Sequence, residues 1–324
     1  MPRLAYYSRV FAAYVLRGRS QLTFWHETPA ENPSASYDRI GPYYMMFAEK
    51  AAYPGPFDQS GVPVLDYRGA IGRQHNPIAI AQYGLARYNR YKATGAEADR
   101  AAFLAQAGWL AANLEPNSRG VPVWHHKFDW EYVKTLKAPW YSGLAQGQGI
   151  SALLRAHVET GEERYMEAAK AAFKSLTLPV QEGGALWLDR DGSTWIEEYI
   201  VSPPTHILNG SLWALWGVRD FALVTRDTQA ETLLERSLQT LEKNLSRYDA
   251  GSWSLYDLTR PGRMRMLASP FYHRLHIVQL RITARMTGRQ VFADYAGRWE
   301  GYTNSWVKRQ RALTYKALFE LLHY

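Results

Sequence analysis

Cysteine is missing from this 324-residue sequence. The chain therefore forms no disulfide bond and offers neither a thiolate nucleophile nor a thiolate metal ligand. The absence of cysteine does not determine the cellular compartment, since reducing and oxidising environments both tolerate such a chain. Long apolar runs are missing as well. A helix that crosses a bilayer needs about 18 consecutive apolar residues, and no stretch is that long, so we expect no transmembrane segment. No RNA- or DNA-binding signature occurs, so nucleic acid is not an expected partner.

The first 20 residues, MPRLAYYSRVFAAYVLRGRS, lack the pattern of a signal peptide, because Arg9 interrupts the apolar run. With Arg17 and Arg19 near its end, the segment is typical of an amphipathic helix. We therefore expect it to be retained, and a cytoplasmic location is favoured. Docking on the protein core is the expected arrangement of this helix, and peripheral contact with a membrane surface is the alternative.

Positive charge and aromatic rings are what the sequence has in excess. Lysine and arginine outnumber aspartate and glutamate by eight, and there are 12 tryptophans and 22 tyrosines. The charge favours a polyanionic partner, which could be a nucleic acid, an anionic membrane surface or an acidic polysaccharide. The aromatic rings favour carbohydrate among these, although such rings also fill ordinary cores. With 47% apolar residues, the chain can bury a large core.

A repeated helical hairpin organises the chain. Four dipeptides each end one helical pattern and precede another, at spacings of 66, 65 and 62 residues: Thr94-Gly95, Thr160-Gly161, Thr225-Arg226 and Thr287-Gly288. The first helix of each pair is rich in small and apolar residues and the second is more amphipathic, so we expect the first helices to form an inner ring. Strand-like pieces lie between the hairpins. The predicted fold is mainly α: an incomplete (α/α) toroid of repeated helical hairpins with short β-hairpin insertions.

Two regions are expected. Residues 1–75 would form an N-terminal helix and a loop or β-like region packed on the core, and residues 76–324 the toroidal, catalytic domain. In such a toroid the inter-hairpin loops gather over one end of a central cavity. Helix N-termini pointing at the cavity would offer free N–H groups and positive dipole ends, which suit carboxylates.

The segment Ala138 to Ser151, APWYSGLAQGQGIS, interrupts an apolar helical pattern with glutamines and glycines. Trp140 and Tyr141 offer flat faces against which sugar rings stack, and Gln146 and Gln148 can donate and accept hydrogen bonds. The segment therefore predicts the edge of a carbohydrate site. The alternative is a helix start packed against a neighbour, because buried aromatic residues usually belong to a core.

This segment and several others resemble the C-terminal domain of the D-glucuronyl C5-epimerases, which convert D-glucuronate to L-iduronate within heparosan or heparan chains. The others, in the family's order, are NPIAIAQYGLARY (76–88), WIEEYIVSPPTHILNG (195–210), RYDAGSWSLYDL (247–258), FYHRLHIVQL (271–280) and RWEGY (298–302). The resemblance implies an epimerase that needs no organic cofactor, an acidic polysaccharide substrate and a homodimer. A bound divalent cation such as calcium is a further implication, for which LDRDGS (188–193) is a candidate, although a plain turn is the preferred interpretation.

The resemblance also assigns roles to residues. Tyr256 and Tyr272 match the two tyrosines implicated in proton transfer, and Glu198 matches an acidic residue implicated beside them; these three are the predicted catalytic residues. Epimerisation at C5 requires a base on one face of the ring, an acid on the other and neutralisation of the adjacent carboxylate. The predicted substrate-binding residues are Tyr199, Trp140, Tyr141, Gln146, Gln148, His273, His276, Arg263, Arg265, Arg274 and Asn209.

Several of these residues have ordinary structural alternatives. Tyr256 could be a buried strand tyrosine, and the arginines could be surface charge. Two histidines three residues apart, His273 and His276, can bind metal, but without a third ligand we expect hydrogen-bonding or carboxylate-neutralising roles and no metal site. Because side chains alternate along a strand, we expect only one of Glu197 and Glu198 to face the site and the other to be solvated.

Two other functions remain open. A polysaccharide lyase begins with the same C5 proton abstraction and then expels the substituent at O4, and a basic, aromatic protein could bind an anionic carbohydrate without catalysis. The sequence also departs from the animal epimerases, with Phe271 in place of an acidic residue, Ile200 in place of a proline and a different loop over 259–270. These departures leave the identity of the uronate polymer open.

Overall fold

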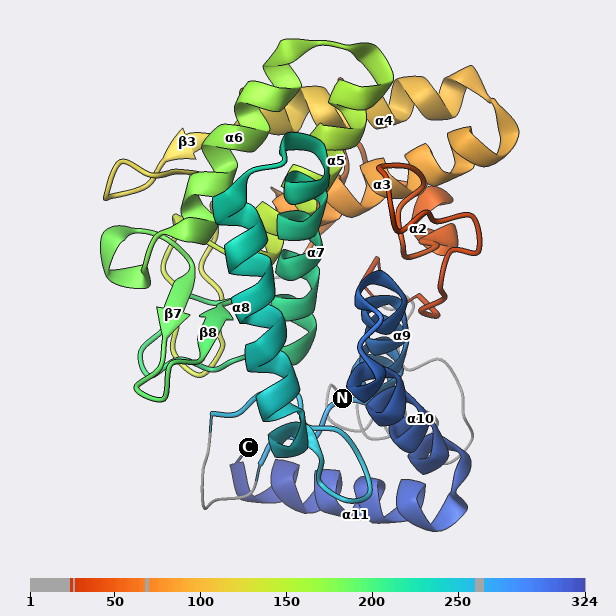
Figure 1. Cartoon of the computed structure of the whole chain (residues 1–324), viewed down its shortest axis with the longest axis vertical. Coiled ribbons are helices and arrows are strands. Elements are labelled where there is room, and N and C mark those ends of the chain that lie inside the picture. Colours follow the sequence, from red (N-terminus) through yellow and green to blue (C-terminus); the bar gives the residue numbers. More distant parts are fainter. Residues whose placement is uncertain (1–23, 26, 68–69, 260–264, 324) are drawn as a thin grey trace. The chain divides into compact units, whose positions relative to one another are not determined.

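The computed structural model describes residues 24–25, 27–67, 70–259 and 265–323. The described chain is mainly helical, with small antiparallel strand pairs (Figure 1). It divides into two compact units, which are described separately. The central unit comprises Asn32–Pro204 and Gly210–Thr240, and the C-terminal unit comprises Met1–Glu31, Thr205–Asn209 and Leu241–Tyr324. The predicted helix over residues 1–20 lies outside the described residues, and the predicted boundary near residue 75 stays a prediction.

Helical hairpins form most of the central unit (Figure 1). The helices, some of which extend beyond this unit, are α2 (Ala48–Ala51), α3 (Pro77–Thr94), α4 (Glu97–Ala112), α5 (Gly143–Thr160), α6 (Glu163–Thr177), α7 (Leu208–Thr225) and α8 (Thr228–Asn244), with a short 3-10 helix at Val180–Glu182. The antiparallel strand pairs are β1 (Val64–Asp66) with β2 (Arg73–His75), β3 (Glu115–Pro116) with β4 (Pro122–Val123), β5 (His125–His126) with β6 (Trp140–Tyr141), and β7 (Leu186–Leu188) with β8 (Thr194–Ile196). The predicted hairpins and β-hairpin insertions are therefore confirmed.

Each predicted dipeptide closes its hairpin with the same local geometry. The residue after the threonine has a left-handed backbone, with φ of 70° at Gly95 and 73° at Gly161, and its N–H donates to the carbonyl four residues before it. The threonine hydroxyl donates to the carbonyl four residues before it and accepts the N–H two residues after it, as at Thr94. Arg226 takes the left-handed position, with φ of 56°, in the one hairpin where glycine is absent. The turns therefore need no contact from elsewhere in the chain.

Glycine brings α5 and α7 into backbone contact within the central unit. A Cβ on Gly147 would lie 2.8 Å from the Ala214 carbonyl oxygen, and one on Gly217 would lie 2.5 Å from the Gly147 Cα. Side chains at either position would separate the helices. Together with α3, these first helices are buried around nearly their whole circumference. The inner ring that we expect them to form stays a prediction.

A buried ion pair lies between these inner helices. Arg155 Nη1 donates to Asp220 Oδ2 over 2.6 Å, and both side chains are fully buried. Tyr44 donates its hydroxyl to the other carboxylate oxygen at 2.5 Å, and the Arg155 guanidinium also donates to the Gly41 carbonyl. Because removal of one partner would leave the other charge buried and unpaired, the pair fixes how α5 and α7 align.

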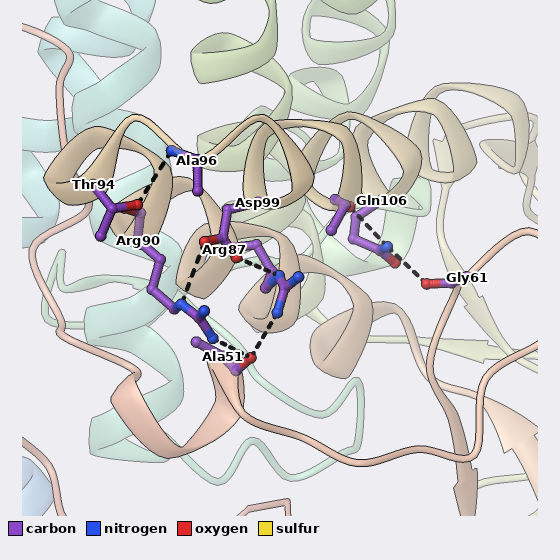
Figure 2. A network of polar contacts seen from close by, with 9 residues as sticks. Ala51, Gly61, Arg87, Arg90, Thr94, Ala96, Asp99 and Gln106 are labelled. Atoms are coloured by element: carbon purple, nitrogen blue, oxygen red, sulfur yellow. Dashed lines mark hydrogen bonds and ion pairs between the residues drawn. The ribbon is translucent and has the colours of Figure 1, made fainter.

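A second polar network fastens the outer helix α4 to its surroundings (Figure 2). Arg87 and Arg90, both on α3, form ion pairs with the buried carboxylate of Asp99 on α4, at 2.9 and 3.4 Å. Both guanidinium groups also donate to the Ala51 carbonyl at the end of α2. Gln106, further along α4, donates to the Gly61 carbonyl. The segment before α3 is thereby held on the first hairpin.

The C-terminal unit consists of a 3-10 turn at Leu245–Tyr248 followed by α9 (Pro270–Thr287), α10 (Gln290–Asn304) and α11 (Trp306–His323). Between the turn and α9 the chain doubles back, with Leu255 opposite Leu267 in an antiparallel bridge. Phe292, Trp299 and Trp253 fill the core of this unit. Nowhere in the described ranges is there a helix long and apolar enough to cross a membrane.

Candidate functional site

Tyr256 lies on the extended segment of the C-terminal unit and is 8% exposed. Its N–H donates to the Met266 carbonyl and its carbonyl accepts the Leu208 N–H, so both backbone polar groups are used. Tyr256 is therefore largely buried, as the structural alternative for this residue expected. Because both groups are paired, the backbone that bears the Tyr256 ring is held in place.

Tyr272 lies in the first turn of α9 and is half-buried. Ser269 caps the helix by accepting the Tyr272 N–H at 3.3 Å. The rings of Tyr256 and Tyr272 pack edge to face, with centroids 4.9 Å apart and planes at 64°. The structure thus brings together, within one unit, the two tyrosines that the resemblance singled out.

His273 and His276 lie on α9 directly after Tyr272 and are fully buried. Burial lowers the pKa of His273 to about 3 and holds the pKa of His276 well below its usual value, so both imidazoles are neutral at physiological pH. Ser254 Oγ lies 2.7 Å from Nδ1 of His273 and 3.0 Å from Nδ1 of His276. A neutral imidazole cannot neutralise a carboxylate, so of the two expected roles hydrogen bonding is the one that fits.

The remaining predicted residues of this unit lie in varied surroundings. Arg274 is exposed on α9, and Arg265 is exposed with its N–H donated to the Tyr315 hydroxyl. Asn209 is buried, and its carbonyl accepts Nε2 of Gln279 at 3.1 Å. Arg263 falls outside the described residues. Both described arginines are exposed cations, and Nη1 of Arg265 donates to the Arg247 carbonyl at 3.5 Å.

Glu198 belongs to the central unit, two residues after the end of β8, and is 5% exposed. Burial raises the pKa of its carboxyl to about 8, the charge of Glu197 adds to the rise, and a hydrogen bond with Tyr199 opposes it. Within the described part of the chain, Oε2 has no hydrogen-bond partner. It faces Gly210 on α7, where a Cβ would lie 2.5 Å from the Cβ of Glu198. At neutral pH this group is a protonated, buried acid.

The expectation that one glutamate of the pair is solvated is wrong, since Glu197 is 1% exposed. The segment that bears Glu197 lies in the interior. The Glu197 N–H donates to the Ala185 carbonyl, and its own carbonyl accepts the Gly143 N–H at the start of α5. Both of its backbone polar groups are therefore paired within the protein, as burial requires.

An aromatic cluster adjoins Glu198 in sequence. Tyr199 packs edge to face on Trp140, with centroids 5.6 Å apart, and contacts Tyr132 at 4.7 Å. Trp140 is 9% exposed, stacks on His126 at 3.8 Å and donates its indole N–H to the Phe128 carbonyl. Within this cluster the half-buried ring of Tyr199 is therefore more accessible than the Trp140 face.

Tyr141 is half-buried, and Gln146 and Gln148 are fully buried. The Tyr141 hydroxyl donates to the Gly184 carbonyl at 2.9 Å, and burial raises its pKa to about 12. Gln146 is fully buried, with its amide nitrogen 3.3 Å from the Ser142 carbonyl. Gln148 accepts the amide of Gln82 at 3.0 Å, also in the interior. Their predicted contact with substrate stays a prediction, and the helix-start alternative describes the packing of the two glutamines.

Side chains cap the N-termini of α3, α5 and α9, so these termini have fewer free N–H groups than was expected. Asn76 caps α3, Ser142 caps α5 and Ser269 caps α9, each by accepting first-turn N–H groups. Capping uses the donors that were expected to bind carboxylates. What these termini still offer an anion is the dipole and the N–H groups that the caps do not use.

The LDRDGS segment forms the plain turn that was preferred for it. The Asp189 N–H donates to the Ser193 carbonyl between β7 and β8. Asp189 accepts the indole N–H of Trp187 on one oxygen and that of Trp195 on the other. The described residues contain no group of three or more histidine, aspartate or glutamate side chains placed to hold a metal ion.

Two residues that the sequence did not single out are important to this geometry, Ser254 and Gly210. The alternation of side chains in SWSLYDL puts Ser254 on the same face as Tyr256, and this signal could have identified it. No comparable sequence signal marks Gly210, because a glycine near a helix start is common. Its role is seen only in the structure, where it allows the close approach of Glu198.

Comparison with known proteins places this chain in a family. The model of the family described as D-glucuronyl C5-epimerase C-terminus matches residues 119–301, which include every predicted site residue. A D-glucuronyl C5-epimerase of Caenorhabditis elegans is 33% identical over 218 residues, covering 62% of this chain and 35% of that protein. An uncharacterized protein of Methanocaldococcus jannaschii is 28% identical over 199 residues, covering 60% of this chain and 63% of that protein.

A solved structure titled UGL_D88N/dGlcA-Glc-Rha-Glc is 16% identical, with a TM-score of 0.48 over 69% of this chain and 61% of that one. The aligned part spans about a third of the C. elegans relative and under two thirds of the M. jannaschii relative. The family model, by contrast, covers more than half of the sequence analysed. From that match, the chain belongs to the D-glucuronyl C5-epimerase family, in the part that forms the C-terminus of those proteins.

Proposed function

We propose that the chain is an isomerase that inverts C5 of D-glucuronate to L-iduronate within an acidic, heparosan-like polysaccharide. The observation that carries the proposal is the edge-to-face contact of Tyr256 and Tyr272, 4.9 Å between centroids, in a chain that belongs to this family. The net positive charge favours a polyanionic substrate. No organic cofactor is needed for this chemistry.

The reaction consists of two proton transfers and no net redox change. A phenolate takes the C5 proton, the electron pair moves into the uronate carboxylate as an enolate, and a second acid returns a proton to C5 from the opposite face. Two rings in direct contact leave no space for a sugar between them. The hydroxyl ends of Tyr256 and Tyr272, not their faces, are therefore the parts that serve C5.

Glu198 is the third proposed catalytic group. Its carboxyl, protonated at neutral pH because burial raises its pKa to about 8, is suited to donating a proton or a hydrogen bond to developing negative charge. Arg265 and Arg274 are the described candidates for pairing with the uronate carboxylate, since both are exposed cations of the C-terminal unit. Tyr199 is proposed to contact the polymer.

The finer fold and assembly expectations belong here as well. We propose that the repeated hairpins form an incomplete (α/α) toroid, which the four matching hairpin closures support, and that the protein is a homodimer. Sedimentation at micromolar concentration tests the dimer: a single species of about 37 kDa, the mass of one chain, would overturn it.

The test of function is incubation of the purified protein with unsulfated heparosan in D₂O, followed by proton NMR. Loss of the C5 proton together with iduronate signals supports the epimerase. An unsaturated uronate would instead identify a lyase, and binding without exchange would identify a non-catalytic carbohydrate-binding protein.

Variants sharpen this test. Tyr256→Phe and Tyr272→Phe keep the ring contact and remove only the hydroxyls, so each should lower kcat by roughly 100-fold or more, the typical contribution of a positioned acid or base. Tyr295→Phe is the matched control. Its ring packs on Trp299 at 5.8 Å in the same unit, and the substitution should leave activity unchanged. Wild-type exchange in both tyrosine variants would remove these residues from the mechanism.

A further inference from the structure

A buried chain of hydrogen bonds runs through the C-terminal unit beside the two tyrosines. His273 Nε2 lies 3.1 Å from the Trp299 carbonyl oxygen on α10. The other nitrogen of the same ring, Nδ1, lies 3.1 Å from the Ser254 N and 2.7 Å from Ser254 Oγ. Ser254 Oγ continues to His276 Nδ1 at 3.0 Å. All three side chains are fully buried.

The direction of each hydrogen bond in this chain is determined. A carbonyl oxygen only accepts, so His273 Nε2 carries the proton and donates to Trp299; Nδ1 of the neutral ring is then an acceptor. That lone pair accepts the Ser254 N–H at 3.1 Å and the Ser254 hydroxyl at 2.7 Å, so the hydroxyl oxygen is left to accept Nδ1–H of His276. His276 thereby has its proton on Nδ1, and its Nε2 has no hydrogen-bond partner among the described residues.

The members of this chain are close neighbours of both tyrosines. Ser254 precedes Tyr256 by two residues along the chain, and His273 directly follows Tyr272. Trp253 adds to the connection, because its ring stacks on His273 at 3.8 Å and its indole N–H donates to the Ala268 carbonyl just before α9. The segment that bears one tyrosine is thus tied to the helix that bears the other.

We propose that Ser254 and His273 are positioning residues, which fix the phenol of Tyr256 relative to that of Tyr272 and so set the balance between the two proton transfers. This inference rests on the proposed function. It assigns no contact with substrate to either residue. Its physical basis is that proton transfer depends steeply on geometry: a misplacement of about 1 Å can cost roughly 100-fold in rate.

The positioning role predicts a particular kinetic defect. When the two phenols are misaligned, abstraction at C5 can still occur, but the proton returns from solvent to the same face more often than to the opposite one. The ratio of C5 deuterium incorporation to iduronate formed should therefore rise. Partial unfolding lowers both quantities equally and leaves the ratio unchanged, so the ratio separates positioning from stability.

The experiment measures this ratio, kcat and KM on heparosan in D₂O for Ser254→Ala. We expect kcat to fall by about 10- to 100-fold with KM within twofold, and the ratio to rise several-fold. Ser175→Ala is the matched control, a buried serine of the central unit whose hydroxyl donates to the Ala172 carbonyl. It should retain the wild-type ratio.

His273→Phe is the second variant, for the case that Ser254→Ala does not fold. It keeps an aromatic ring against Trp253 and removes both nitrogens, so it should reproduce the raised ratio. A wild-type ratio and kcat in either folded variant would overturn the positioning role while the proposed function stands. Absence of exchange in the wild-type protein would overturn the proposed function, and the positioning role with it.

Discussion

Replacing Glu198 by glutamine should change how stability depends on pH. Burial raises the pKa of this carboxyl to about 8 in the folded protein, whereas the unfolded chain has the ordinary value of about 4.5. Between these values the folded state keeps a proton that the unfolded state has lost, so the stability of the wild-type protein falls as pH rises. The slope from this group approaches about 1.4 kcal/mol per pH unit, and the loss accumulates to roughly 4 kcal/mol by about pH 8.

Glu198→Gln replaces the protonated carboxyl with a neutral amide of similar shape and removes this loss. Urea unfolding, followed by tryptophan fluorescence from pH 4.5 to 8.5, gives the comparison. The two proteins should have similar stability near pH 4.5, and the variant should be the more stable by roughly 4 kcal/mol near pH 8.5. A difference that stays constant across this range would refute the burial argument.

Glu159→Gln provides a control of opposite sign. Partial burial by itself would raise the pKa of Glu159, but hydrogen bonds from Tyr91, Lys92 and Arg100 outweigh it and lower the pKa. This carboxylate stabilises the protein at neutral pH and loses that effect as pH falls through its lowered pKa. The glutamine variant should therefore be less stable than wild type at pH 7, with a difference that shrinks in acid.

Two further predictions concern backbone geometry and are checked by the same unfolding measurements. Arg226→Gly relieves the strain of an exposed left-handed residue and should stabilise the protein by about 1 kcal/mol. Gly161→Ala, at the equivalent turn with open space around it, should destabilise the protein by about as much. Equal stability of the two variants would contradict the strain argument. Gly147→Ala places a methyl group against the Ala214 backbone and should cost about 3 kcal/mol or more, while Gly108→Ala, a helical glycine whose Cβ would meet nothing within 4 Å, should stabilise by about 0.5 to 1 kcal/mol. If Gly147→Ala proved neutral, the close approach of α5 and α7 would be wrong.

The hairpins could be predicted from the sequence because their signals are local. Each Thr-Gly closure is complete within a few residues, and the contrast between apolar first helices and amphipathic second helices follows directly from residue type. The tyrosine pair was also predicted, through resemblance and not through spacing. Nothing in the local pattern around Tyr256 distinguishes a catalytic phenol from an ordinary buried ring.

The environment of the site residues could not be predicted, because it depends on segments distant in sequence. Ser254 meets its histidines 19 and 22 residues away, and Glu198 is buried by Gly210 on another element. The solvated interpretation of one glutamate followed from the alternation of side chains along a strand and failed, because both glutamates are buried. Asn76, Ser142 and Ser269 are residue types that favour N-cap positions, so the use of some N–H groups by these caps follows from local sequence.

The threonine turns of the hairpins have a consequence for how this protein can evolve. Each turn forms its own backbone hydrogen bonds, so the closure of a hairpin depends little on the loop that joins it to the next hairpin. The β3–β4 and β7–β8 loops, which carry none of the proposed catalytic residues, can therefore be lengthened, shortened or exchanged without disturbing these turns. Under the proposed function, a change of polymer specificity is open to such loops, with Tyr256 and Tyr272 kept in place.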